Sequence, residues 1–245
     1  MIEVHELSKV FHDRKRGEIR ALDAVSFRCQ PGQIFGLLGV NGAGKTTCLR
    51  LLATILRPSG GTATVGGHDI VAAPDRVRAS VGFLSTATAL YDRLTAYEMV
   101  QYFGRLHGLD ENALRARLEE IFTLLAMNEF RDRRCGQLST GMKQKVSIAR
   151  TLVHDPAVMI FDEPTLGLDV LTARTIVGFV RDCRARGKTV IFSTHVMSEV
   201  EKLCDAIAII HGGRIVAEGT LAQLRECTGA RDLEDIFVQL VEARP

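Results

Sequence analysis

The pattern of apolar and polar residues changes character several times along the chain. Residues 2–7 and 25–29 largely alternate between the two types, which predicts strands with one solvent-exposed face. Short apolar runs at residues 34–38, 81–84 and 158–161 predict buried strands, and further strands are predicted at residues 62–65, 189–193 and 206–210. Helical patterns over about 172–184 and 198–204 lie between the last three predicted strands. Such alternation predicts a mainly parallel sheet, with the first two strands forming an antiparallel edge.

A stretch with helical periodicity interrupts this mixed pattern. Thr95 and Glu98 have the spacing of a capping box, and apolar residues follow on one helical face. A second helix is predicted to open at Asp110, where apolar residues recur every three or four positions. A third is predicted over about 143–153. Residues from about 87 to 152 are therefore expected to form an inserted all-helical lobe.

The end of the chain, about 220–245, is predicted to be a helical tail. The apolar residues of 231–241 recur at helical spacing there. The whole pattern predicts one α/β domain over residues 1–245, with a mainly parallel sheet, an antiparallel β edge and an α-helical lobe. A chain of 245 residues is long enough to bury a sizeable core in such a domain.

Composition and charge narrow the class of protein. The net charge of +2 is too small to favour a nucleic-acid partner, and the basic clusters at 131–134 and 181–188 are expected to be solvated faces. No apolar run reaches the ~20 residues that span a bilayer, and Met1 does not open a signal peptide, so we expect a soluble, cytoplasmic chain. The six cysteines are scattered without metal-ligand spacing, which predicts reduced core residues rather than a zinc site.

The first chemical signal is the sequence GVNGAGKT, which begins at Gly39 between a predicted strand and a predicted helix. Gly42 and Gly44 also allow tight turns, so that successive N–H groups converge at the positive end of the helix dipole and can hold phosphates. Lys45 can then reach the outer phosphates, and the Thr46 hydroxyl can ligate the Mg²⁺ that bridges them. The alternative is a glycine-rich turn with an exposed lysine.

A second motif, VMIFDEP, ends an apolar strand with two carboxylates. Asp162 lies at the carboxyl end, where ligands gather in α/β sheets, and can hold Mg²⁺ through water. Glu163 can orient and polarise a water for attack on a γ-phosphate. Adjacent residues of a strand point to opposite faces, so we expect the two carboxylates to have different roles. The alternative is a polar turn ahead of Pro164.

Three further positions are candidates for ligand contact. In the sequence LSTGM, the Ser139 hydroxyl, Gly141 and the N–H groups at the start of a helix can form a second anion site. The alternative is that Ser139 is an ordinary helix cap. His195, at the carboxyl end of a strand, can hydrogen-bond a γ-phosphate, whereas most single histidines are satisfied polar residues. Phe11 precedes a polar stretch that we expect to be an exposed loop, and its ring can stack on adenine or pack in the core.

The motifs GVNGAGKT, LSTGMKQK, VMIFDEP, GLD and STH occur in the order and at the approximate separations of the ATP-binding subunits of ABC transporters. The chain resembles these subunits over nearly its whole length. The resemblance implies a P-loop NTPase core, ATP and Mg²⁺ as ligands, and a head-to-tail homodimer in which ATP lies between the glycine loop of one subunit and the LSTGM segment of the other. It implies that neither the glycine loop nor the LSTGM segment encloses ATP without the other subunit.

The resemblance also assigns roles to single residues. It implies ATP contacts from Phe11, Gly39, Asn41, Gly42, Ala43, Gly44, Lys45, Thr46 and Thr47, and contacts to the opposite subunit's ATP from Ser139, Thr140, Gly141 and Met142. Glu163 would be the general base and His195 the γ-phosphate contact. Thr46 and Asp162 would hold the metal, and Asp169 would communicate across the dimer interface.

Finer features, such as GFLSTATALYDRLT and STHVMSEVEKLCD, are most similar to the NatA-type branch, which is associated with sodium export and a separate membrane permease. This implies an ATPase that drives export from the inner face of the cell membrane and contacts its permease through the helical lobe. The alternative is a non-transport ABC ATPase of the translation or DNA-repair type. Such proteins usually carry two nucleotide domains or a long coiled-coil insertion, and the sequence shows neither.

Two positions depart from the family pattern. Val40 stands where many members have proline, which should matter little because backbone N–H groups bind the phosphates. Ser85 and Thr86 stand where the family usually has a glutamine that contacts Mg²⁺ and couples to the permease. A hydroxyl can approach the metal only through water, and we retain Thr86 as a candidate on that basis.

Overall fold

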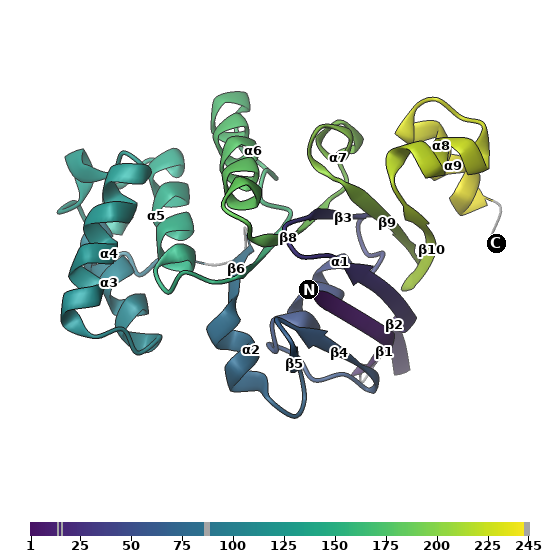
Figure 1. Cartoon of the computed structure of the whole chain (residues 1–245), viewed down its shortest axis with the longest axis horizontal. Coiled ribbons are helices and arrows are strands. Elements are labelled where there is room, and N and C mark those ends of the chain that lie inside the picture. The colour runs from purple at the N-terminus through teal and green to yellow at the C-terminus, as the bar shows by residue number, and fades with distance from the viewer. Residues whose placement is uncertain (14, 16, 86–88, 243–245) are drawn as a thin grey trace. The chain divides into compact units, whose positions relative to one another are not determined.

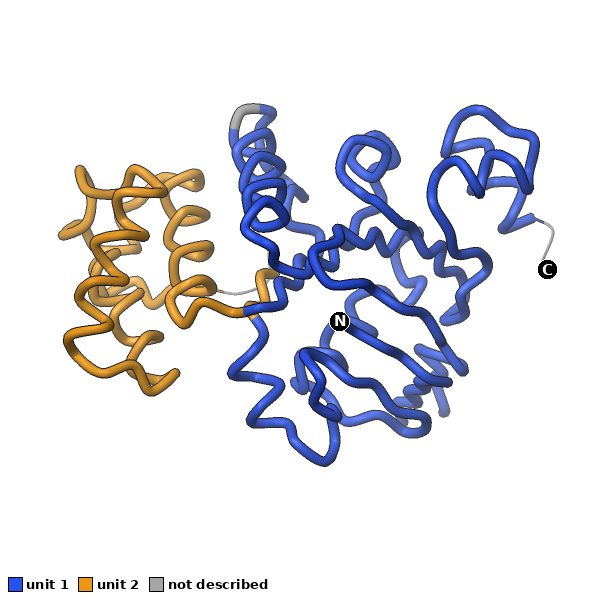
Figure 2. Tube along the Cα trace, in the orientation of Figure 1, with its two compact units in different colours: residues 1–81, 157–245 blue, residues 82–156 orange. Residues whose placement is uncertain are grey.

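The structure is a computed structural model that describes residues 1–13, 15, 17–85 and 89–242. The chain divides into two compact units, one made of residues 1–81 and 157–245 and the other of residues 82–156 (Figure 2). Thr86, a candidate metal ligand, lies outside the described residues.

A sheet of mainly parallel strands forms the centre of the first unit (Figure 1). Within this unit the strand order is β10-β9-β3-β8-β7, and only β10 runs antiparallel to its neighbour. The strands are β3 (Ile34–Leu38), β7 (Val158–Asp162), β8 (Thr189–Thr194), β9 (Ala206–His211) and β10 (Arg214–Gly219). Every residue of β3, β7 and β8 is buried, as expected for parallel strands covered on both faces. Their carboxyl ends therefore meet at one edge of the sheet.

The second sheet of this unit is antiparallel, with the order β2-β1-β4-β5. Its strands are β1 (Ile2–Asp13), β2 (Gly17–Cys29), β4 (Gly60–Val65) and β5 (His68–Asp69). The exposed loop predicted at residues 12–18 is shorter than expected, because β1 and β2 stay paired as far as Asp13 and Gly17 and leave Lys15 in an exposed turn. Backbone pairing across the hairpin holds His12, Asp13 and Glu18 in strands, and their side chains remain in solvent.

The helices of the first unit cover both faces of its central sheet. Helix α1 (Lys45–Leu52) contacts β2, β4 and β7 and so lies between the two sheets, whereas α6 (Val170–Ala185) and α7 (Met197–Leu203) contact β8 from the other side (Figure 1). Helix α2 (Pro74–Ser80) contacts β5. The amphipathic tail folds as α8 (Leu221–Thr228) and α9 (Leu233–Glu242), which pack on a cluster that includes Leu38 and Ile209.

The second unit is helical after β6 (Val81–Ser85). It contains α3 (Ala96–Leu106), α4 (Glu111–Leu124) and α5 (Thr140–Leu152), with two short 3₁₀ turns at Asn128–Phe130 and Cys135–Gln137. The predicted capping box is present, because the Thr95 hydroxyl accepts the Glu98 N–H at 3.1 Å and the Glu98 carboxylate accepts the Thr95 N–H at 2.8 Å. In the part of the chain that is described, no helix is both long and apolar enough to cross a membrane.

The cysteines lie as free thiols at scattered positions. Burial raises the pKa of the Cys29, Cys48 and Cys183 thiols to about 12, so they stay protonated and unreactive at neutral pH. The expectation of a core position was wrong for Cys227, which is exposed on α8 because the helix buries only Leu224.

Candidate functional site

The glycine loop connects the end of β3 to the start of α1. Gly42 and Gly44 have φ angles of +82° and +110°, in the left-handed range that favours glycine. A β-carbon on Gly39 would lie 2.4 Å from the Ile210 carbonyl oxygen, and one on Gly44 would lie 2.7 Å from the Ala21 carbonyl oxygen. The loop therefore needs glycine for its conformation and for the close approach of neighbouring backbone.

The rest of the loop is fixed by backbone hydrogen bonds. The Ala43 N–H donates to the Val40 carbonyl at 3.2 Å, and the Ala43 carbonyl accepts the Gly213 N–H at 3.0 Å. Asn41 is exposed and Thr47 is half-buried. No described side chain caps the first turn of α1, so its N–H groups remain available to an anion held by the loop.

Lys45 is the buried cation of the site. Its side chain is only 5% exposed, and its Nζ donates to the carbonyls of Gly39 at 2.6 Å and Val40 at 3.2 Å. The same ammonium lies 2.9 Å from Glu163 Oε1. That contact is an ion pair without the alignment of a hydrogen bond. The alternative of an exposed lysine on a glycine-rich turn was therefore wrong.

Asp162 is the last residue of β7 and is almost fully buried. Its Oδ1 accepts two hydrogen bonds at 3.0 Å, one from the Thr46 hydroxyl and one from the Ser193 hydroxyl. A carboxylate and a hydroxyl are hard oxygen donors, the type that Mg²⁺ prefers. The structure thus brings the two expected metal ligands into direct contact.

Glu163 follows the strand with a left-handed backbone, at φ +49°. Non-glycine residues in this region are strained and cluster at functional sites. Two hydrogen bonds stabilise this strained conformation: the Glu163 N–H donates to the carbonyl oxygen of Ser193 at 3.1 Å and to its hydroxyl oxygen at 3.2 Å. Because Glu163 lies beyond the last strand residue, strand alternation does not set the direction of its side chain. That side chain contacts Lys45 and His195, whereas Asp162 contacts hydroxyl groups.

His195 comes directly after β8 and completes the group. Its Nδ1 lies 2.7 Å from Glu163 Oε2, and its side chain is 36% exposed. Direct contacts join Lys45 and His195 to Glu163, and Thr46 to Asp162, the residue before Glu163 in the chain. We call these five residues the loop cluster. The cluster joins a cation, two carboxylates, a hydroxyl and an imidazole beside a glycine loop whose geometry suits an anion.

Ser193 is a further member of the site, and the sequence motifs include it only as the first residue of STH. It is fully buried, donates to Asp162 and accepts from the backbone of Glu163, so it ties the two carboxylate residues together. A signal for this role exists in the sequence, since Ser193 and Thr194 place two hydroxyl groups at the end of an otherwise apolar strand. Buried polar side chains of this kind need hydrogen-bond partners.

In the second unit, the LSTGM segment forms the start of α5. Ser139 is the N-cap, and its hydroxyl accepts the Met142 N–H at 3.3 Å. Ser139 and Thr140 are exposed, and Gly141 and Met142 are half-buried. The structure therefore supports the helix-cap interpretation of Ser139 and leaves this helix start accessible.

Two predicted residues stand apart from the loop cluster. Asp169 is an N-cap for α6, since its carboxylate accepts the Thr172 N–H at 3.0 Å and the Thr172 hydroxyl at 2.7 Å. Phe11 pairs with Ile19 near the end of the β1–β2 hairpin, and the Lys9 ammonium lies 5.1 Å from the centre of its ring. The ring is 37% exposed, so it is not a core residue.

Comparison with known proteins decides the family. A family model described as ABC transporter matches residues 22–166, which include the glycine loop, the LSTGM segment and the two carboxylates. The chain belongs to the ABC transporter family. As an ATP-binding domain of this family, it is an ATPase with the P-loop α/β fold.

Individual relatives agree with this assignment. The ABC transporter ATP-binding protein NatA of Bacillus subtilis is 43% identical, over 97% of each chain. The Nod factor export ATP-binding protein I of Paraburkholderia xenovorans is 39% identical, over 90% of this chain and 73% of its own length. Among solved structures, an ATP-binding subunit of an ABC transporter matches with a TM-score of 0.87 and 29% identity, over 98% of this chain and 99% of its own.

A further solved structure is a dimeric ATP-binding cassette in a post-hydrolysis state, bound to ADP and phosphate. It matches with a TM-score of 0.80 and 25% identity, over 90% of this chain and 99% of its own. This relative was therefore seen with the products of ATP hydrolysis.

Proposed function

We propose that this ABC ATPase powers export through a separate membrane permease and that the exported cargo is sodium. The hydrolytic part of the proposal rests on one observation: the Glu163 carboxylate lies between the Lys45 ammonium and the His195 imidazole, beside the glycine loop. These contacts supply a base, a phosphate-binding cation and a polar group able to contact a γ-phosphate at one place.

Binding of ATP would use the loop first. The N–H groups of residues 42–47 would hold the phosphates, and Lys45 would exchange its contact with Glu163 for a γ-phosphate oxygen. That exchange would free the Glu163 carboxylate when the nucleotide arrives. The partly exposed ring of Phe11 would be free to stack on adenine.

The residues present fit Mg²⁺. Thr46 Oγ1 and Asp162 Oδ1 are 3.0 Å apart, and Mg²⁺ is usually held by one or two protein oxygens with phosphates and waters completing its shell. Over the described residues there is no group of three His, Cys, Asp or Glu side chains suited to a metal, which agrees with so sparse a protein shell. When bound, Mg²⁺ would neutralise charge on the β- and γ-phosphates.

Glu163 would act as the general base. Its carboxylate would orient the attacking water and accept its proton, while Ser193 keeps the Glu163 backbone in place through two hydrogen bonds. His195 would contact the γ-phosphate and hold the carboxylate through Nδ1. The remaining contacts would come from a second copy of the chain, whose Ser139, Thr140, Gly141 and Met142 would face the same ATP, with Asp169 near the dimer interface.

We expect Asp162→Asn to raise the Mg²⁺ concentration for half-maximal ATPase activity by about 10- to 100-fold, the usual effect of losing a group that acts on a metal through its outer shell. Asparagine keeps an oxygen that accepts from Thr46 and Ser193 but removes the negative charge. A Mg²⁺ titration of ATPase activity measures the shift. Asp182→Asn, on the exposed face of α6, is the matched control, and an unchanged Mg²⁺ requirement in Asp162→Asn would exclude this residue from metal binding.

The transport part of the proposal rests on similarity. NatA is 43% identical over nearly the whole chain, and other relatives are named for Nod factor export or daunorubicin resistance. Their names point to different transported substrates with a similar ATP-binding protein, so the permease would select the substrate. Sodium follows from the NatA-type sequence features, and the chain would sit at the cytoplasmic face of the membrane through its permease.

The test is ATPase activity of the purified chain with and without the membrane protein that copurifies with it. Activity would be measured across a sodium series, with potassium replacing sodium at constant ionic strength. We expect turnover to rise with the permease and with sodium. Turnover that responds to the permease but not to sodium would refute the cargo, and copurification with ribosomes or DNA instead would refute the transport role.

A further inference from the structure

We propose that Glu199 is a positioning residue for ATP hydrolysis: it ties the turn that begins at Glu163 to the end of the strand that precedes His195. The inference rests on the proposed function, in which Glu163 is the base and His195 its partner. Nothing in the motifs assigns a role to this carboxylate, which lies in α7 outside the loop cluster.

One oxygen of Glu199 makes the tie. Its Oε2 accepts the Thr194 hydroxyl at 3.0 Å and the Thr165 hydroxyl at 3.1 Å. Thr194 is fully buried at the end of β8, and its own oxygen accepts the Val196 N–H at 3.0 Å. A single carboxylate therefore joins the segment after β7, the last residue of β8 and the turn into α7.

The same two segments carry the reacting groups. Glu163 and Thr165 belong to one turn, which the Leu166 N–H closes by donating to the Glu163 carbonyl at 3.1 Å. Thr194 directly precedes His195. The 2.7 Å contact between Glu163 and His195 therefore joins the same two segments that Glu199 joins through Thr165 and Thr194. Hydrogen bonds to a carboxylate are about twice as strong as neutral ones, so this second tie restrains the contact.

The restraint matters because the backbone at Glu163 is strained. A left-handed φ of +49° is unfavourable for a residue other than glycine and persists only where the surroundings impose it. Ser193 holds the turn at its first residue, and Glu199 holds it two residues later through Thr165. Without Glu199, two hydroxyl groups lose their acceptor and the turn can relax away from His195.

ATP binding should depend little on Glu199. The ammonium of Lys45 is fixed by the Gly39 and Val40 carbonyls, and the glycine loop is held by β9 and the turn at Gly213. None of these contacts involves α7. A loss of positioning should therefore appear in kcat and leave KM for ATP almost unchanged.

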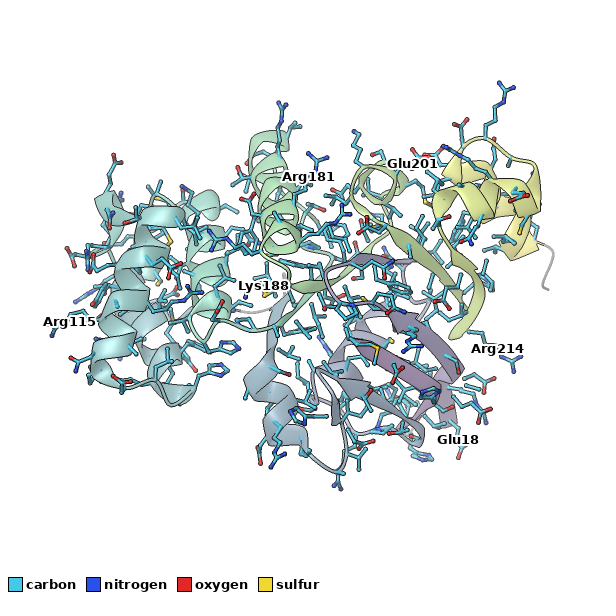
Figure 3. The ribbon with its side chains drawn as sticks, in the orientation of Figure 1. Glu18, Arg115, Arg181, Lys188, Glu201 and Arg214 are labelled. Atoms are coloured by element: carbon cyan, nitrogen blue, oxygen red, sulfur yellow. The ribbon has the colours of Figure 1, made fainter. Side chains whose placement is uncertain are left out.

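The experiment measures kcat and KM for ATP in the full chain. We expect Glu199→Ala to lower kcat by about 10- to 100-fold, the size of effect that a misplacement of about 1 Å produces, with KM within about twofold of wild type. Glu199→Gln keeps an acceptor oxygen and should recover most of the rate. Glu201→Ala is the matched control, because this exposed carboxylate lies on the same helix (Figure 3) and pairs with Arg225.

A double-mutant cycle separates positioning from general structural damage. If Glu199 acts through Glu163, Glu199→Ala should cost almost nothing further in single-turnover rate when Glu163 is already glutamine. Thr165→Val removes one of the two hydrogen bonds and should show the same dependence with a smaller loss, so it serves where Glu199→Ala fails to fold.

Three results would overturn the inference. The first is a wild-type kcat in Glu199→Ala. The second is a fall in kcat that comes with a comparable rise in KM for ATP. The third is an equal fall in single-turnover rate whether residue 163 is glutamate or glutamine. The proposed function has a separate readout, since it fails if wild-type turnover does not depend on Glu163. With Glu163-dependent turnover in wild type, any of the three results removes the role of Glu199 alone.

Discussion

Glu163→Gln is expected to lower kcat for ATP hydrolysis by about 100- to 10,000-fold, the contribution typical of a positioned general base. Glutamine matches glutamate in size and can keep contact with His195, but its amide cannot take the proton from an attacking water. ATP binding should persist or improve. The substitution removes the anion 2.9 Å from the Lys45 ammonium, so the cation no longer has to leave a carboxylate to reach a phosphate.

The measurements are steady-state ATPase activity, nucleotide affinity and the mass of the chain in solution. With ATP bound and not turned over, Glu163→Gln should accumulate as the dimer proposed above, which we expect wild type to form only transiently. Glu201→Gln removes a carboxylate that pairs with Arg225 on the surface and should behave as wild type. If Glu163→Gln retains wild-type turnover, the base is another group and the assignment of Glu163 fails.

The parts of this site that could be predicted from sequence are those whose chemistry is carried by neighbouring residues. The sequence GVNGAGKT contains the turn glycines, the cation and the hydroxyl, and the pair Asp162-Glu163 ends an unmistakably apolar run. Parallel strands bring such ends to one edge of a sheet, so their meeting could be expected. The individual contacts could not, because hydrogen bonds such as those of Ser193 depend on the register between β7 and β8.

The fold shows a similar division. The buried strands and amphipathic helices were predicted because burial on one or both faces leaves a clear periodic pattern. Helix α2 escaped prediction, since it is short and buries only Val77. The outer halves of β1 and β2 escaped as well, because their polar residues are held by pairing with each other while their side chains face water. Pattern reasoning detects burial, and these elements bury almost nothing.

The buried ion pair also determines what loss of its cation should do. We expect Lys45→Ala to weaken ATP binding by about 10- to 100-fold, since hydrogen bonds to a charged group contribute about 1.5–3 kcal/mol each. The substitution should also lower the free energy of unfolding by about 3–5 kcal/mol, the usual cost of breaking a buried pair by removing one partner. It leaves the Glu163 carboxylate, whose side chain is only 13% exposed, without its counter-charge.

The double variant Lys45→Ala with Glu163→Gln distinguishes the two effects. Removing both charges leaves no unpaired buried ion, so most of the lost stability should return in a denaturant titration. ATP affinity should stay low, because neither residue then offers a cation to the phosphates. Recovery of both quantities would mean that Lys45 serves the fold and not the nucleotide. Recovery of stability alone identifies it as the phosphate-binding cation that Glu163 neutralises in the structure described here.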